Sequence, residues 1–273
     1  MKKTLSAFFF FSSLIAFAQE TKIPYGYNDE VGKYFDAGGV KLYYEIYGKG
    51  TPVLMLHGGV YGYIDEYEFL IPKLAQSHQV ICLATRGHVK SEIGNEPNTY
   101  KQRATDAYKL VQHLELDSVT VIGFSDGGHA ALKMAALYPQ SVSRLVVMGA
   151  GFHPPGSRTE TFNYTPEELM KGSKEYFTKR LKHMPEPERW GEALAMVSKM
   201  YNEDAPTKED LESIKCPVLM MSGDKDRYSD VASVVNAYKL IKQASLSIIP
   251  ACGHVIFYCN FPAVWESMKG FVK

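Results

Sequence analysis

The sequence lacks a concentration of charge of either sign. Its 273 residues hold 30 Lys and Arg against 30 Asp and Glu, so the formal net charge is zero. The basic residues are scattered along the chain, whereas a nucleic-acid-binding domain presents a basic face. We therefore expect no nucleic-acid partner. Hydrophobic residues make up 45% and charged residues 22% of the chain, which excludes the disordered and fibrous classes.

Cysteine is also scarce, with four residues in the chain. Their spacing matches no zinc-binding pattern, so we predict no metal site. Cys82 and Cys216 belong to apolar runs, where buried thiols are expected. Cys252 and Cys259 are seven positions apart around a loop. The sequence leaves open whether they form a disulfide, because spacing alone does not supply the geometry that the bond requires.

Apolar runs long enough to span a membrane are missing as well. The apolar run at residues 5–17 follows Lys2 and Lys3 and ends in the small-residue pattern Ala16-Phe17-Ala18. This combination is typical of a secretory signal peptide. We expect removal of residues 1–18, no stable membrane anchor afterwards, and export to a periplasm or to the medium.

What the sequence does contain is a series of short apolar runs that alternate with amphipathic stretches. Two alternating strands are predicted first, and six nearly continuous apolar runs follow them, which is typical of strands buried on both faces. The predicted strands are residues 33–39, 40–50, 52–59, 79–87, 118–125, 144–151, 217–224 and 245–254. The predicted helices are residues 64–76, 100–115, 126–138, 230–242 and 262–272. The alternation predicts an α/β fold with a mostly parallel eight-stranded sheet, whose functional groups gather at the carboxyl ends of the strands.

One connection is far longer than an ordinary loop. Residues 151–215 hold three segments with helical apolar spacing, and Thr165 followed by Pro166 and Glu168 marks a helix start. We interpret this stretch as a helical lid. It is inserted into a sheet domain formed by residues 19–150 and 216–273.

The strongest motif is the sequence from Gly123 to Gly127, which fits the pattern Gly-x-Ser-x-Gly. It joins a predicted strand to a predicted helix, and at such a sharp turn only glycines fit on either side of the serine. The turn lifts the Ser125 hydroxyl above the sheet. It also places the N–H of Asp126 at a helix N-terminus, where developing negative charge is stabilised. Ser125 is therefore the predicted nucleophile.

A serine nucleophile needs a base, and the base needs an acid that orients it. His254 follows the last predicted strand, and the chain order serine, acid, histidine makes it the predicted base. Asp224 and Asp226 both follow the preceding strand. Asp224 is placed to cap the turn after Gly223, whereas Asp226 lies further into the loop. We prefer Asp226 and leave Asp224 as the alternative.

A second N–H for the oxyanion is expected from the loop after residues 52–59. Gly59 is the predicted donor, beside the N–H of Asp126, and Val60 is the next choice. We interpret His57 as a brace for this loop, because His254 already fills the role of base.

With Ser125, Asp226 and His254 in this order and His57-Gly58-Gly59 upstream, the chain resembles the α/β-hydrolases. The resemblance covers nearly all of the sequence after residue 18. The stretches GFSDGGHAALKMAALYP, SVSRLVVMGAG and SGDKD are most similar to the valacyclovir hydrolase (biphenyl hydrolase-like) group, then to enol-lactonases and haloperoxidase-like esterases. One loop departs from the family pattern Asp-x-Arg-Gly-x-Gly-x-Ser, because Ala84 and Val89 replace its acid and its second glycine. This departure weakens the assignment to a subgroup.

The resemblance implies a serine hydrolase that needs no cofactor and transfers an acyl group to water. A small-molecule carboxylic ester is the first choice of substrate, ahead of a lactone or thioester. The alternatives are C–C or amide hydrolysis on the same triad, and a catalytically silent binding protein. The resemblance also implies that the Asp126 carboxylate receives a substrate ammonium group, and the alternative is that it caps the helix it opens.

Residues near the predicted site loops or in the lid are candidates for the wall of a substrate pocket. They are Val60, Tyr61, Phe124, Phe152, His153, Trp190 and Phe257. The identity of the acyl group and the oligomeric state are not encoded in any pattern that we find.

Overall fold

The apolar runs form one eight-stranded sheet in the computed structural model, which describes residues 23–154 and 161–273. The predicted signal peptide lies outside the described residues. The strands are β1 (Gly32–Asp36), β2 (Lys41–Tyr47), β3 (Thr51–Leu56), β4 (His78–Leu83), β5 (Val119–Phe124), β6 (Val142–Met148), β7 (Val218–Gly223) and β8 (Ala244–Ile249). Their order is β1-β2-β4-β3-β5-β6-β7-β8. The pairs β1–β2 and β2–β4 are antiparallel and the others are parallel, which confirms the predicted fold class.

Burial along the strands follows from their place in the sheet. Strand β5 is buried at all six positions, as expected of an inner strand that is covered on both faces. At the edge, β1 buries only Phe35. The carboxyl end of β5 is therefore fixed by the neighbouring strands β3 and β6 and by the layers on both faces of the sheet. Ser125 follows it directly.

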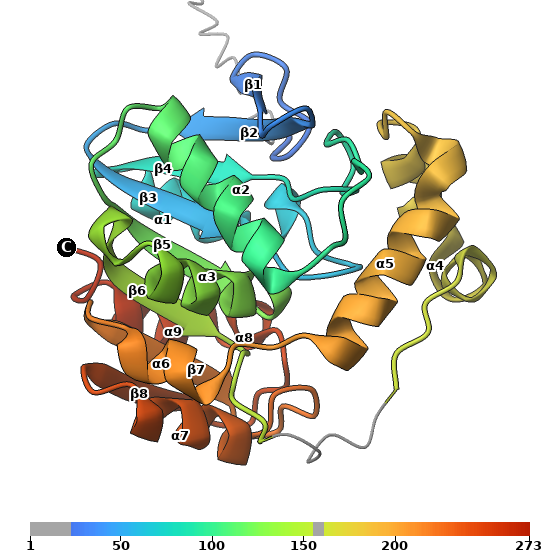
Figure 1. Cartoon of the computed structure of the whole chain (residues 1–273). Helices are drawn as coiled ribbons and strands as arrows, with labels where there is room; N and C mark the ends of the chain where they lie inside the picture. Colours follow the sequence, from blue (N-terminus) through green and yellow to red (C-terminus); the bar gives the residue numbers. More distant parts are fainter. Residues whose placement is uncertain (1–22, 155–160) are drawn as a thin grey trace, which may run out of the picture.

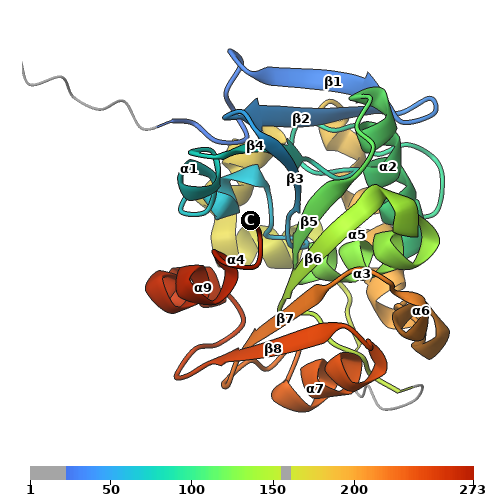
Figure 2. The ribbon, with the colours of Figure 1, turned by 90° about the vertical axis from the view of Figure 1, so that its left-hand side faces the viewer.

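Helices cover both faces of the sheet (Figure 2). On one face, α2 (Tyr100–His113), α3 (Asp126–Leu137), α6 (Lys208–Ser213) and α7 (Val231–Leu240) share a hydrophobic core with the strands. On the other face, α1 (Ile71–Leu74), α8 (Ile256–Cys259) and α9 (Phe261–Met268) enclose a second core. Short 3-10 turns complete the set as η1 (Ile64–Tyr67), η2 (Pro139–Ser141) and η3 (Pro187–Arg189). Within the described ranges, no helix is both long and apolar enough to cross a membrane.

The predicted helix at residues 64–76 is wrong as a single element. The chain forms η1, a turn, and then the short helix α1. Pro72 stands in the first turn of α1, where a missing backbone N–H costs nothing. The proline therefore starts a new helix instead of continuing the first one.

The long connection holds α4 (Pro166–Leu181) and α5 (Trp190–Glu203), which lie beyond the sheet on the side of its carboxyl ends (Figure 1). We call α4 and α5 the lid helices. The Thr165 side chain caps α4 by accepting a hydrogen bond from the Glu168 N–H at 3.3 Å. The third predicted lid helix is different. Helix α6 packs against α3 and α7, and its Asp210 pairs with Lys133 of α3 at 2.6 Å, so it belongs to the flank of the sheet.

Candidate active site

Ser125 occupies a strained turn between β5 and α3. Its backbone has φ 52° and ψ −115°, a conformation that a residue with a side chain adopts only when its surroundings impose it. A Cβ on Gly127 would overlap the carbonyl oxygen of Leu56 at the end of β3. A Cβ on Gly123 would overlap the carbonyl oxygen of Gly127 itself. Both glycines are therefore required by the close approach of backbone to backbone.

The structure brings Ser125, His254 and Asp226 together. Nε2 of His254 lies 2.8 Å from Ser125 Oγ, and its Nδ1 lies 2.8 Å from Asp226 Oδ2. The other oxygen of Asp226 accepts hydrogen bonds from the backbone N–H groups of Tyr228 at 2.8 Å and Ser229 at 3.0 Å. With Asp226 Oδ2 as the acceptor, we assign the imidazole proton to Nδ1, so Nε2 is free to accept the proton of the serine hydroxyl.

The alternative acid, Asp224, has a different partner. Its Oδ1 accepts a hydrogen bond from the Cys252 N–H at 3.2 Å, in the loop that carries His254. The structure thus separates the two candidates. Asp226 contacts the imidazole, and Asp224 supports the backbone beneath it.

A disulfide between Cys252 and Cys259 resolves the pairing that the sequence left open. The bond closes the short loop around His254 and ties it to α8. Cys252 is buried and Cys259 is exposed, so solvent reaches the bond from one side. Cys82 and Cys216 are free thiols. Cys82 is buried as expected, whereas the expectation was wrong for Cys216, which stands just before β7 and is only partly buried.

The two predicted oxyanion donors are neighbours. A Cβ on Gly59 would lie 3.4 Å from the Cβ of Asp126, so the loop after β3 meets the start of α3 beside Ser125. His57 holds this loop from behind. Its Nδ1 donates to the Gly58 carbonyl at 2.7 Å, and its Nε2 accepts from the Thr85 N–H at 3.0 Å. Burial lowers the pKa of His57 well below its usual value, which keeps the ring neutral and fits the interpretation of His57 as a brace.

Sequence reasoning missed Glu66, which lies in η1 beside the same loop. Its Oε1 accepts a hydrogen bond from the Gly58 N–H at 2.6 Å. Burial raises the pKa of Glu66 to about 8, so the carboxyl is mostly protonated at neutral pH. No motif marks this residue, because it stands in an ordinary amphipathic stretch.

The Asp126 carboxylate does not cap α3, and it has a partner that the sequence did not suggest. It forms an ion pair with Arg103 of α2, and both side chains are only 1% exposed. Burial raises the pKa of Asp126, while Arg103 and the hydroxyl groups of Tyr201 and Tyr100 act in the opposite direction. The residue at the N-cap of α3 is Ser125, and Asp126 follows it. An intramolecular guanidinium thus takes the place foreseen for a substrate ammonium.

A family model described as the alpha/beta hydrolase fold matches residues 51–197. The chain belongs to the α/β-hydrolase family. A 2-hydroxy-6-oxononadienedioate/2-hydroxy-6-oxononatrienedioate hydrolase of Paraburkholderia xenovorans is 26% identical, over 86% of this chain and 89% of the relative. The structure of a serine hydrolase involved in carbazole degradation has a TM-score of 0.73 at 24% identity, covering 89% of this chain and 98% of its own. The enol-lactonase of Burkholderia xenovorans has a TM-score of 0.71 at 19% identity, covering 88% and 99%.

The hydrolase has a cavity of about 1160 Å³ above Ser125. It lies between the lid helices and residues 57–62 after β3, which we call the oxyanion loop because the predicted donor Gly59 belongs to it. The predicted wall residues Val60, Tyr61 and Phe124 line it. Sequence reasoning missed most of the other lining side chains, because they come from separate segments that share no pattern. Several of these are tyrosines, namely Tyr100, Tyr164, Tyr176, Tyr201, Tyr228 and Tyr258.

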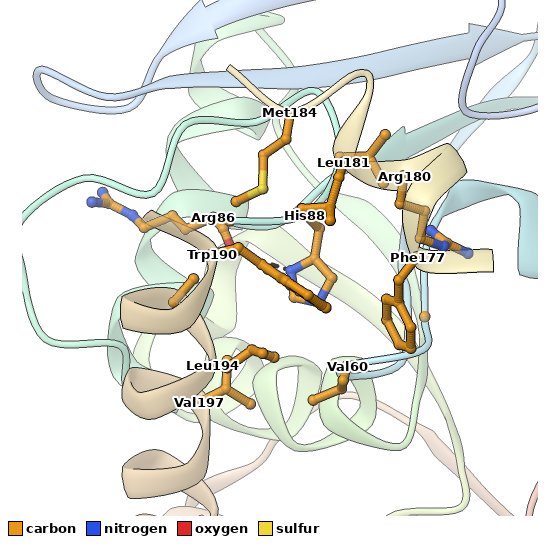
Figure 3. Close-up of a pocket in the computed structure, with 14 residues that line it drawn as sticks. Val60, Arg86, His88, Phe177, Arg180, Leu181, Met184, Trp190, Leu194 and Val197 are labelled. Atoms are coloured by element: carbon orange, nitrogen blue, oxygen red, sulfur yellow. Dashed lines mark hydrogen bonds between the residues drawn. The ribbon is translucent and has the colours of Figure 1, made fainter. Parts of the chain in front are cut away.

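Trp190 was expected in the same wall, but the structure places it at a second, smaller cavity of about 40 Å³ (Figure 3). This cavity lies between the lid helices and the loop after β4, and its walls are mostly apolar. Val60 lines both cavities. Trp190 and Tyr201 lie on one face of α5 but eleven residues apart, so the position along the helix decides which cavity each residue reaches. No sequence pattern shows how far the helix extends past each cavity.

Three more predicted wall residues line neither of these two cavities in the described part of the chain. They are Phe152, His153 and Phe257. Phe257 is core instead, because its ring packs between those of Phe124 and Tyr67 at centroid distances of 4.9 Å and 5.6 Å. Phe152 packs against the core on the α3 side of the sheet.

The loop that departs from the family pattern has an architectural role. Arg86 donates two hydrogen bonds to the buried Asp106 carboxylate of α2, at 2.6 Å and 2.9 Å. The Ser91 hydroxyl donates to the Ala84 carbonyl at 2.7 Å. Val89, where the family pattern has glycine, holds a φ of 50°. These contacts join the loop to α2 and to its own backbone, so they stabilise the fold.

Proposed function

We propose that this hydrolase cleaves carboxylic esters of small molecules through an acyl-enzyme on Ser125. The observation that carries the proposal is the continuous hydrogen-bonded series from Ser125 through His254 to Asp226, with 2.8 Å at each of its two steps. A serine hydroxyl is a weak nucleophile on its own, and this arrangement is the one that activates it.

In the proposed reaction, Ser125 Oγ attacks the ester carbonyl carbon while His254 Nε2 accepts the hydroxyl proton. The tetrahedral oxyanion receives hydrogen bonds from the N–H groups of Gly59 and Asp126. The C–O bond to the alcohol then breaks, and His254 returns the proton to the leaving oxygen. A water molecule attacks the acyl-enzyme in the same way and releases the acid. Asp226 keeps the imidazole oriented and stabilises its charged form throughout.

A second candidate is hydrolysis of a C–C bond, which the Paraburkholderia relative favours through its named substrate, a dienedioate. A dicarboxylate calls for cationic groups close to the nucleophile. Here Arg103 is already paired with Asp126, and Arg180, a cation of α4 that lines the cavity, is paired with Asp65. Lys179 of α4 lines the cavity as well. With two of these three cations paired, a neutral ester suits the charge pattern better.

The test is hydrolysis of p-nitrophenyl esters of increasing acyl length by wild type and by Ser125→Ala, with a 2-hydroxy-6-oxo-dienoate measured beside them. Ester turnover that Ser125→Ala loses supports the proposal. Faster cleavage of the dienoate selects C–C hydrolysis. A wild-type protein that turns over neither substrate, and that a fluorophosphonate probe does not label, is a binding protein with a silent triad.

We also propose that the protein is exported. The charged and apolar pattern of residues 1–18 supports this, and so does a disulfide, which persists in an oxidising compartment. Mass spectrometry of the protein recovered from an expressing bacterial host tests it. A mature chain beginning at Gln19 in the periplasm or medium is the expected result, and an intact N-terminus in the cytoplasm contradicts it.

A further inference from the structure

The hydroxyl of Tyr201, on lid helix α5, lies at the oxyanion loop. A Cβ on Gly59 would overlap Tyr201 Oη, and it would lie 3.4 Å from the Cβ of Asp126. The hydroxyl also forms a hydrogen bond with the Asp126 carboxylate, which helps to hold the pKa of that carboxyl down. Tyr201 therefore touches both residues whose N–H groups are proposed to bind the oxyanion.

Asp126 is anchored from two elements at once. Arg103 and Tyr100, both of α2, contact its carboxylate from the sheet domain, and Tyr201 contacts it from the lid. An uncompensated carboxylate beside an oxyanion site would oppose the negative charge of the intermediate. With the Arg103 guanidinium paired to it, the Asp126 side chain acts as a fixed point for the first residue of α3.

The end of α5 that carries Tyr201 is attached to the sheet domain. Met200 is 2% exposed and packs in the core shared by α2 and α3. The Asp204 carboxylate, just after α5, accepts a hydrogen bond from the Tyr100 N–H at 2.7 Å. This end of α5 lies toward the sheet and the opposite end lies away from it (Figure 1). Tyr201 is thus part of the floor of the site, although it belongs to the inserted segment.

We propose that Tyr201 is a positioning residue of the oxyanion hole, a proposal that rests on the proposed ester hydrolysis. Its hydroxyl fixes the separation of the Gly59 loop from the start of α3 and so aims both N–H groups at the developing oxyanion. The insertion then completes the catalytic site as well as enclosing the substrate.

The experiment compares Tyr201→Phe with wild type on p-nitrophenyl butyrate. The phenylalanine ring keeps the contacts of Tyr201 with Phe162 and Tyr164 and loses only the hydroxyl. We expect kcat to fall about tenfold with KM unchanged, because an effect on transition-state binding alone lowers kcat and leaves KM. Tyr138→Phe is the matched control. It removes a half-buried hydroxyl that contacts Thr105 at 2.9 Å near the opposite end of α3, and it should keep the wild-type kcat.

A double-mutant cycle with Asp126→Ala provides a second readout, because alanine leaves no acceptor for the Tyr201 hydroxyl. If Tyr201 acts through Asp126, the two losses in kcat are not additive, and Tyr201→Phe costs no more than about twofold in the D126A background. Thermal midpoints of all variants establish that each is folded. An unchanged kcat in Tyr201→Phe, an increase in KM alone, or full additivity overturns the positioning role while Ser125-dependent turnover stands. Absence of Ser125-dependent turnover in wild type overturns the proposed function, and the positioning role with it.

Discussion

Asp226 and His254 face each other across the loops that follow β7 and β8, with 2.8 Å between Asp226 Oδ2 and His254 Nδ1. Asp224 follows the same strand two residues earlier and accepts a hydrogen bond from the Cys252 backbone instead. One short loop therefore supplies two carboxylates with separate tasks. Asp226 contacts the imidazole of the proposed base, and Asp224 supports the chain segment that carries it.

Asp226→Asn should lower kcat for an ester about 10⁴-fold with little change in the fold, because the amide favours the wrong tautomer of His254. The measurement is steady-state hydrolysis of p-nitrophenyl butyrate together with a thermal midpoint. Asp224→Asn is the matched control, since an asparagine oxygen still accepts from the Cys252 N–H. It should retain most of the wild-type kcat, and an equal loss in both variants would show that the acid is wrongly assigned.

Glu66 should limit activity at high pH. Its raised pKa of about 8 means that the carboxyl is neutral below that pH and negatively charged above it, beside the Gly58 N–H. The charged groups that act on it are Arg180, Asp65 and Asp126. A new negative charge next to the oxyanion loop opposes the intermediate, so kcat should fall as the pH rises through about 8. Glu66→Gln should remove this alkaline limb, and a limb identical to that of wild type would exclude Glu66 as its source.

The stability of the fold gives an independent check on Glu66. Its pKa is raised above the ordinary value of 4.5, so the folded state binds the proton more tightly than the unfolded state does. The corresponding stabilisation is complete below about pH 4.5 and is lost as the pH rises through about 8. Urea unfolding at pH 6 and pH 9 should show a smaller difference for Glu66→Gln than for wild type. Equal differences in the two proteins would contradict the shifted pKa.

Loss of the disulfide should lower both stability and activity, because the bond closes the loop that carries His254. Replacing both Cys252 and Cys259 by alanine should cost about 2 kcal/mol of unfolding free energy, the value expected for a loop of this length. The loop around His254 then gains freedom, so kcat should fall as well. Wild type treated with dithiothreitol should behave like the double variant, whereas Cys216→Ala should not. Full activity in the double variant would show that α8 alone holds the loop.

The enzyme should not distinguish an α-aminoacyl ester from its des-amino analogue. The carboxylate suited to bind the ammonium group, Asp126, is already paired with Arg103, and its side chain is only 1% exposed although the residue lines the cavity. The ratio of kcat/KM for the two p-nitrophenyl esters should therefore be close to one. A strong preference for the amino ester would mean that the pair opens when substrate binds.

The three residues of the proposed triad could be predicted from the sequence, because each follows a strand whose apolar run is unmistakable. Ser125, His254 and Asp226 meet because the carboxyl ends of parallel strands lie along one edge of the sheet. Choosing Asp226 over Asp224 needed only the extra reach of two residues. Where a strand ends and which residues follow it are local properties of the chain, and the apolar periodicity of the sequence predicts them well.

The second set of residues around the site was out of reach for a physical reason. Arg103 meets Asp126 through the packing of two helices, and Tyr201 reaches Gly59 from an insertion whose orientation no motif encodes. The placement of Trp190 was not predicted correctly either. Its helix was foreseen, but the position of the indole along the helix axis decides which of the two cavities it lines.

The backbone of Ser125 has a consequence for how this protein can be changed. A φ of 52° suits glycine at no steric cost, whereas serine holds it under strain worth about 1 kcal/mol or more. Ser125→Gly should therefore unfold at a higher urea concentration than Ser125→Ala, although both lack the nucleophile. Selection for thermal tolerance alone would therefore favour glycine at this position, and glycine lacks the hydroxyl on which the proposed reaction depends.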